Sequence, residues 1–250
     1  MSSPLGKVTK AVRRVGLPFW KTRRVRLGNR QPVVSFSFDD FPRSALAAGG
    51  AILEEYQARG TYYTAWGLMG VRNHEGEHFC LEDIADLLRR GHELGSHTFA
   101  HSSALNSPID QFAADVARGE SQVAALRGSG APGNFAYPFG GVTFASKPAI
   151  GSRLRSCRGI RGGVMAPFAD LNLLLANRLY SNSFDHNSIE RLIDENKKRR
   201  GWLIFYTHDV RENPSDYGCT PQQLASAVRA ASRSGAQLLT VSQALDVIGA

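Results

Sequence analysis

Short β-rich runs alternate with helix-like segments after the first thirty residues, and no other feature of the sequence constrains the fold as strongly. The run "PVVSFSF" (32–38) precedes a helix-like stretch at 44–59, and "TYYTAWG" (61–67) comes next. This alternation is typical of a parallel sheet wrapped by helices. Seven or eight such runs within 250 residues predict an α/β fold, a single distorted TIM-like (β/α) barrel with seven or eight strands. We assign residues 1–30 to a basic N-terminal arm and residues 31–250 to the barrel.

Polar clusters follow four of the strand-like runs. They are Asp39-Asp40 after the first run, His97 to His101 after "HELGS", the "YPFGG" turn, and His208-Asp209 after "WLIFYT". In barrels of this kind the loops that follow the strands form the active site. We therefore expect the four clusters to meet at the C-terminal face of the barrel.

The pair His97 and His101 has the spacing of two ligands of one metal ion. On a helical turn, side chains at i and i+4 face the same way, with Cβ atoms about 5–6 Å apart. A catalytic zinc needs about three nitrogen or oxygen ligands and an open position. Either Asp40 or Asp39 is placed to supply the carboxylate ligand.

A second histidine pair lies in "NHEGEHF" (73–79), which contains the H-E-x-x-H string of zinc proteases. In those enzymes the string lies on a stable helix. Here Gly76 stands at its centre and Glu77 occupies a position where an apolar residue would pack. We predict a solvated loop for His74 and His78, keep a zinc protease as a remote alternative, and leave a substrate-side role open.

The net charge of +8 is concentrated at one end of the chain. Residues 1–30 contain no acidic residue and nine basic ones: Lys7, Lys10, Arg13, Arg14, Lys21, Arg23, Arg24, Arg26 and Arg30. Removing these nine from the 30 basic residues leaves 21 against 22 acidic residues, which is close to neutral. We therefore expect no nucleic-acid partner. The arm either contacts an anionic membrane peripherally or straps onto the barrel.

Cellular location and redox state follow from what the sequence lacks. No run of about 18 apolar residues and no secretory signal is present, so we expect a cytoplasmic protein, in peripheral contact with a membrane if the arm binds lipid. Cys80, Cys157 and Cys219 are widely spaced and form no CxxC motif. We interpret them as reduced structural thiols.

Four motifs in order resemble those of the polysaccharide deacetylases, the NodB homology domain of carbohydrate esterase family four. They are "SFSFDDFP" (35–42), "SHTFAH" (96–101), "FAYPFG" (135–140) and "LIFYTH" (203–208), and the likeness covers about residues 33–245. The resemblance implies a divalent-metal site, usually zinc, formed by Asp40, His97 and His101. It also implies that Asp39 is the general base and His208 the general acid.

The resemblance further implies a site for the oxyanion and the substrate in the third motif. Its backbone donor aligns with the amide N–H of Phe139, and we include Tyr137 among the residues of this region. The chain departs from the family where a base-steadying Arg is usual, because Ala136 stands there, and we expect Arg161 to replace it. Phe41 stands where Gly is usual, and we expect its ring to narrow the substrate groove.

The fourth family motif has no clear match. Asp185 is a candidate for orienting His208, although capping the following helix is the more natural role for it. The predicted function is a metal-dependent hydrolase that removes acetyl groups, most of all N-acetyl groups, from a carbohydrate by cleaving a linear amide C–N bond. The alternative is a non-catalytic carbohydrate-binding barrel. The sequence does not specify an oligomeric state.

Overall fold

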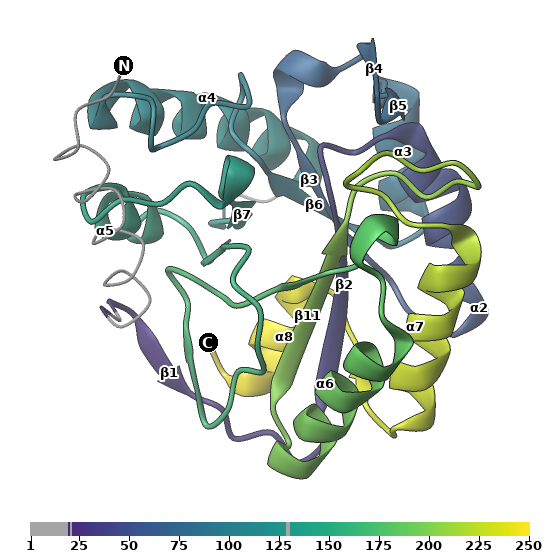
Figure 1. The fold of residues 1–250 in the computed structure, drawn as a ribbon. Helices are drawn as coiled ribbons and strands as arrows, with labels where there is room; N and C mark the ends of the chain where they lie inside the picture. Colours follow the sequence, from purple (N-terminus) through teal and green to yellow (C-terminus); the bar gives the residue numbers. More distant parts are fainter. Residues whose placement is uncertain (1–19, 21, 129–130) are drawn as a thin grey trace, which may run out of the picture.

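The computed structural model describes residue 20, residues 22–128 and residues 131–250. Parallel strands make up the main sheet, in the order β10-β11-β2-β3-β6-β7-β8, with β12 paired to β2. Their bounds are β2 (Val33–Asp39), β3 (Thr61–Thr64), β6 (Glu93–Ser96), β7 (Asn134–Ala136), β8 (Ser156–Arg158), β10 (Asn177–Arg178), β11 (Trp202–Thr207) and β12 (Gln237–Leu238). Figure 1 shows β2 and β11 side by side at the centre of the molecule.

A short connecting segment closes the curled sheet into a barrel. Leu174 forms a parallel bridge with Arg158 of β8, and three residues later β10 pairs with β11. This segment therefore links the two ends of the curled sheet, although only a single bridge joins it on the β8 side. The predicted distorted (β/α) barrel with seven or eight strands is confirmed.

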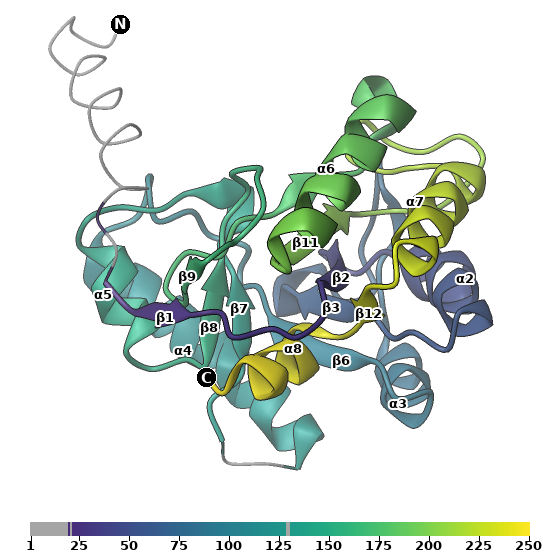
Figure 2. The same ribbon diagram turned by 90° about the horizontal axis from the view of Figure 1, so that it is seen from below.

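Helices surround the sheet, and α8 lies across the lower end of the barrel (Figures 1 and 2). They are α2 (Ala51–Glu55), α3 (Leu81–Arg89), α4 (Ile109–Arg127), α5 (Ser146–Gly151), α6 (His186–Arg199), α7 (Pro221–Arg233) and α8 (Val241–Ile248). Short helical turns are η1 (Ala45–Gly50), η2 (Trp66–Leu68), η3 (Pro138–Gly140) and η4 (Ser181–Ser183). The Thr220-Pro221 pair starts α7, and Thr220 and Gln223 form a capping box there.

The central strands are buried on both faces because the sheet is covered on both. Every residue of β2 and of β11 is buried. Phe36 and Phe205 belong to the core beneath the outer helices, whereas Val33 and Ile204 belong to a second core that includes α8. Continuous hydrophobic runs of this kind are expected for parallel strands buried on both sides.

The basic N-terminal segment contributes a strand to the fold. Strand β1 (Arg24–Arg26) pairs antiparallel with β9 (Phe168–Asp170), and Leu27 packs in the core. The Arg23 guanidinium donates to the carbonyl oxygens of Gly151 and Leu154 at 2.6 and 2.8 Å. Most of the arm for which we expect either membrane contact or packing onto the barrel, residues 1–19 and 21, lies outside the described residues.

No helix among the residues that the structure describes combines the length and the apolar character needed to cross a membrane.

Candidate active site and metal centre

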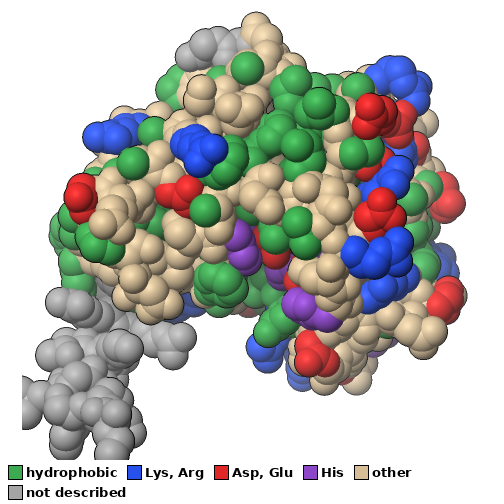
Figure 3. Space-filling model, turned by 90° about the horizontal axis from the view of Figure 1, so that it is seen from above, with side chains coloured by type: hydrophobic (Ala, Val, Ile, Leu, Met, Phe, Trp, Pro, Cys, Tyr) green, Lys and Arg blue, Asp and Glu red, His purple; other side chains and the backbone are tan. Residues whose placement is uncertain are grey.

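The polar residues lie together because neighbouring parallel strands end at the same height in the barrel. Phe38 lies opposite Thr207, and Thr64 lies opposite Ser96. The residues that directly follow β2, β6 and β11 therefore emerge at one edge of the barrel. Seen from above, histidine and carboxylate side chains lie together in a hollow there (Figure 3).

The two aspartates at the end of β2 are separated by a sharp change of backbone direction. Asp39 is the last residue of the strand, and both Asp40 and Phe41 have left-handed backbone angles, with φ of +59° and +55°. The turn sends the Phe41 ring into the core, where it packs against Tyr62 and Phe79. Phe41 is fully buried, so our expectation that its ring narrows the substrate groove is wrong.

His97 and His101 converge without the helical turn that their spacing suggested. The segment between them is irregular, with left-handed backbone at Thr98 and His101. Gly119 of α4 makes room for this loop, because a Cβ at that position would come within 2.5 Å of the Thr98 backbone. The two imidazole rings lie 5.1 Å apart between centroids.

Three potential ligand atoms meet at Asp40. Its Oδ1 lies 3.5 Å from Nε2 of His97 and 3.1 Å from Nε2 of His101. The Nδ1 of His97 lies 2.7 Å from the carbonyl oxygen of Ala136, which can only accept, so Nδ1 carries the proton and Nε2 presents its lone pair. Asp40, His97 and His101 thus form a set with the ligand chemistry of a divalent-metal site.

The charge state of this set fits a bound cation. Burial lowers the pKa of His97 to about 3 and that of His101 to about 4, so both rings are neutral at pH 7. Burial, and then the charges of Glu75 and Asp39, raise the pKa of Asp40 well above its usual value. Its Oδ1 is buried and has no hydrogen-bond partner among the residues that the structure describes. An orphaned buried carboxylate oxygen facing two neutral imidazoles is an arrangement that a metal ion would satisfy.

Asp39 is paired with a buried arginine that the sequence interpretation missed. The Arg158 guanidinium donates to Oδ1 of Asp39, and it lies between the rings of Tyr63 and Tyr206, at 5.0 and 4.9 Å from their centroids. Arg158 is fully buried. Although burial alone would raise the pKa of Asp39, the Arg158 charge holds it below its ordinary value.

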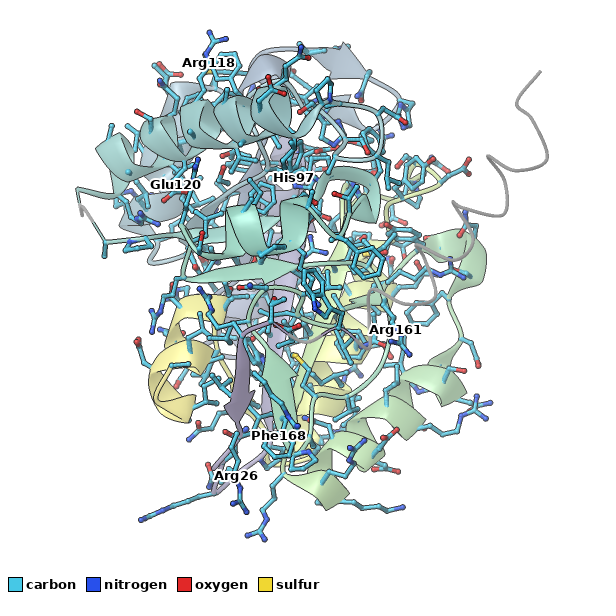
Figure 4. All side chains as sticks on the ribbon, turned by 90° about the vertical axis from the view of Figure 1, so that its left-hand side faces the viewer. Arg26, His97, Arg118, Glu120, Arg161 and Phe168 are labelled. Carbon is cyan, nitrogen blue, oxygen red and sulfur yellow. The ribbon has the colours of Figure 1, made fainter. Side chains whose placement is uncertain are left out.

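The expectation for Arg161 is therefore corrected, because the structure places Arg158 against Asp39. Arg161 is exposed, and Figure 4 shows it well apart from His97. Arg158 is the register partner of Ala136 on the neighbouring strand. The guanidinium thus comes from β8 rather than from β7, where the family usually has it. Only the pairing of these two strands shows that the arginine beside Asp39 comes from β8.

His208 follows β11 and faces Asp40 from the other side of the hollow. Its Nε2 lies 4.0 Å from Oδ2 of Asp40, and its Nδ1 lies 3.2 Å from the carbonyl oxygen of Tyr217. The rings of Tyr180 and Tyr217 flank the imidazole, with centroids 5.9 and 5.6 Å away. Asp185 does not contact His208, because its carboxylate caps α6 by accepting from the Asn187 N–H.

The third-motif residues divide between the site and the core. Phe139 has a left-handed backbone, its ring lies 4.5 Å from that of His101, and its side chain is 66% exposed. Tyr137 is buried and packs against Phe135 and Phe112, so its side chain does not line the hollow. Of the two, only Phe139 is placed to contact a substrate.

The H-E-x-x-H string forms a β-hairpin instead of a helix. Strands β4 (Arg72–Asn73) and β5 (Gly76–Glu77) pair across it, and His74 is exposed. His78 is buried, so the predicted solvated loop is wrong for this residue, and Glu75 is buried as well. The hairpin does not form the metal-binding helix of a zinc protease. Glu75 is a site residue that we did not predict, because one of its oxygens, one of Asp40 and a ring nitrogen of His208 lie within 4.8 Å of one another.

Fold and site together define a (β/α) barrel with an Asp-His-His set at the C-terminal edge of its strands. Residues 27–150 match the sequence profile of the polysaccharide deacetylases. The chain belongs to the polysaccharide deacetylase family. Membership of this family supports carbohydrate deacetylation as the reaction. A search of curated protein sequences finds no match to the chain.

Solved structures of carbohydrate deacetylases and esterases share the fold. A family 4 acetyl xylan esterase from Clostridium thermocellum, in complex with a cobalt ion, is 19% identical with a TM-score of 0.58, over 87% of this chain and 92% of that one. Peptidoglycan deacetylase PdaC from Bacillus subtilis is 15% identical with a TM-score of 0.56, over 87% and 92%. PdaA of Bacillus subtilis, a family 4 carbohydrate esterase, is 11% identical with a TM-score of 0.57, over 94% and 89%. At these identities the likeness concerns the fold alone.

Proposed function

We propose that this protein is a divalent-metal-dependent deacetylase that hydrolyses N-acetyl groups of a carbohydrate. The observation that carries the proposal is the convergence of Asp40, His97 and His101 between an ionised Asp39 on one side and His208 on the other. Two nitrogen ligands and one oxygen ligand suit zinc. The cobalt complex of the acetyl xylan esterase also supports a divalent ion.

Each side chain of the site has a role in amide hydrolysis that its position permits. A divalent ion, when bound by Asp40, His97 and His101, would polarise the acetyl carbonyl group and acidify water. Asp39, kept ionised by Arg158, would accept a proton from the attacking water molecule. The Phe139 N–H would donate to the oxygen on which negative charge develops.

His208 would complete the reaction by giving its proton to the departing nitrogen. The C–N bond breaks, the water oxygen stays on the acetyl carbon, and the products are acetate and a free amino sugar. An amide nitrogen leaves poorly until it is protonated, so this step needs an acid on the leaving-group side. The Tyr217 carbonyl fixes the orientation of the imidazole by accepting from Nδ1.

The buried ion pair favours catalysis over the alternative of a non-catalytic binding barrel. A charged arginine and a charged aspartate are costly to bury, and a sugar-binding surface has no use for a base at this position. Residues of perturbed pKa in a hollow are a frequent mark of catalytic sites.

Acetate release tests the proposed reaction. The purified chain with bound zinc is expected to release acetate from N-acetylated chito-oligosaccharides, and His208→Asn is expected to lower kcat about 100-fold because the nitrogen then leaves unprotonated. Bound metal, measured by elemental analysis, should be the same in both proteins. Binding of the oligosaccharide by the wild type with no acetate released would instead favour the non-catalytic barrel.

We further propose that residues 1–19 hold the protein on anionic membranes. This segment carries Lys7, Lys10, Arg13 and Arg14 and no acidic residue. Each cation near an anionic surface contributes roughly 1 kcal/mol to binding. Deletion of residues 1–19 leaves β1 intact and is expected to abolish co-sedimentation with vesicles that contain phosphatidylglycerol. Equal binding before and after the deletion would refute this role, and neutral phosphatidylcholine vesicles give the baseline.

A further inference from the structure

The hairpin that carries Glu75 is clamped to the loop that carries His208. The Arg211 guanidinium donates to the carbonyl oxygen of His74 at 2.6 Å and to Oδ2 of Asp209, the residue after His208, at 2.7 Å. The His74 and Tyr217 rings also lie 5.9 Å apart between centroids. The position of Glu75 relative to His208 is therefore fixed by contacts on both sides.

Local contacts also fix the Glu75 side chain within the hairpin. Its backbone N–H donates to Oδ1 of Asn73 at 2.8 Å, and Gly76 takes a φ of +110° that turns the chain back. His78 lies beneath, with Nδ1 at 3.0 Å from the Val71 carbonyl oxygen and Nε2 at 3.3 Å from Oε2 of Glu75. Glu75 is only 4% exposed.

The two oxygens of the Glu75 carboxylate have different neighbours. His78 lies at hydrogen-bond distance from Oε2, whereas Oε1 lies 3.8 Å from Nε2 of the exposed His74. A distance of 3.8 Å is too long for a hydrogen bond to His74, so Oε1 can accept a hydrogen bond from a ligand in the hollow.

Glu75 lies beside the position that the leaving nitrogen of the proposed reaction would occupy. A nitrogen that receives the His208 proton must approach the imidazole to about 3 Å. Glu75, Asp40 and His208 each present an atom within 4.8 Å of the others. A scissile nitrogen between the acetyl carbon and the imidazole therefore falls within reach of the Glu75 carboxylate.

We propose that Glu75 is a specificity-determining residue that accepts a hydrogen bond from the N–H of the scissile acetamide and so selects acetamides over acetyl esters. This inference rests on the proposed function. An acetamide nitrogen carries a hydrogen to donate, whereas the bridging oxygen of an ester has only lone pairs, which a carboxylate repels. After C–N cleavage the same carboxylate faces the ammonium group of the product, which strengthens the contact.

The test compares amide and ester hydrolysis by matched variants of the full chain. Glu75→Gln is expected to lower kcat/KM for an N-acetylated chito-oligosaccharide about 10- to 100-fold, the range for a hydrogen bond to a charged group. Its kcat/KM for an O-acetylated xylo-oligosaccharide should stay the same or rise. The control is Glu77→Gln, the same change on an exposed carboxylate of the same hairpin that pairs with Arg43 and Arg72. It should leave both values unchanged.

Two further measurements keep the inference separate from the proposed function. Bound zinc should be the same in Glu75→Gln as in the wild type, and loss of zinc would identify Glu75 as a metal ligand and overturn the inference. By calorimetry, the wild type should bind a chitosan oligosaccharide, which carries free amines, about 10-fold or more tightly than Glu75→Gln does. The binding measurement tests the role of Glu75 even if the wild type releases no acetate from either substrate. That absence of acetate would refute the proposed function.

An equal fractional loss of kcat/KM on the amide and on the ester leaves their ratio unchanged and would overturn the inference. Glu75→Asp serves as a second variant if Glu75→Gln does not fold. It keeps the charge but withdraws the carboxylate by one methylene, so the amide-to-ester ratio should fall between those of the wild type and Glu75→Gln.

Discussion

Replacement of His97 by alanine is expected to release the metal ion and to abolish the release of acetate from the substrate. His97 is buried, its Nδ1 proton is held by the Ala136 carbonyl, and its Nε2 lone pair points at Oδ1 of Asp40. Without that imidazole only two ligands remain, which is too few for tight binding of zinc. We expect about one zinc ion per chain in the dialysed wild type, and less than about a tenth of that in His97→Ala.

The control for this experiment is His74→Ala, which removes the exposed histidine of the hairpin. Its metal content should equal that of the wild type. Circular dichroism of both variants checks that the fold is intact. Metal that survives the loss of His97 but disappears with His74 would contradict the proposed site and would return the H-E-x-x-H string to the metal centre.

Replacement of Arg158 by methionine is expected to destabilise the fold and also to weaken Asp39 as the general base. The change leaves the Asp39 carboxylate buried without its cation, and breaking a buried pair in this way typically costs about 3–5 kcal/mol. Urea unfolding at pH 7 measures the loss of stability. Arg161→Met is the matched control, three residues away and exposed, and should change the unfolding free energy by no more than about 0.5 kcal/mol.

The pH dependence of the Arg158→Met defect follows from the pKa of Asp39. Burial raises the pKa of Asp39, and the Arg158 charge lowers it by more. In the folded protein the pKa of Asp39 therefore lies below the ordinary value of about 3.9. A depressed pKa contributes stability above the ordinary value and loses it as the pH falls through the folded pKa. The deficit of Arg158→Met should therefore be largest near neutral pH and should shrink in acid. A deficit that is constant with pH would mean that packing, not charge, explains the loss.

The barrel could be predicted because its signals are local. Strand-like runs such as that of β2 (Val33–Asp39), buried throughout, alternate with helices that carry their own start signals, such as Thr220-Pro221. Parallel strands in one barrel point the same way, so the residues after them must share an edge. Asp40, His97 and His101 could be placed together on that basis, even though the helical turn expected between the histidines does not exist.

The partners of the two proposed proton-transfer residues could not be predicted in this way. Arg158 reaches Asp39 because β7 and β8 pair with Ala136 opposite Arg158. The register of two strands depends on contacts between residues that are far apart in the sequence. Glu75 reaches the site because Arg211 ties its hairpin to the loop after β11.

Local patterns of hydrophobicity and turn residues were therefore sufficient to predict the barrel. They also sufficed for the candidate metal ligands, because the strands that precede Asp40 and His97 end at the same edge of the barrel. Which arginine neutralises Asp39, and which carboxylate stands beside His208, depends on long-range packing of strands and loops. That packing is settled only when the whole chain is folded, because burial of each charge is tolerable only with its distant partner in place.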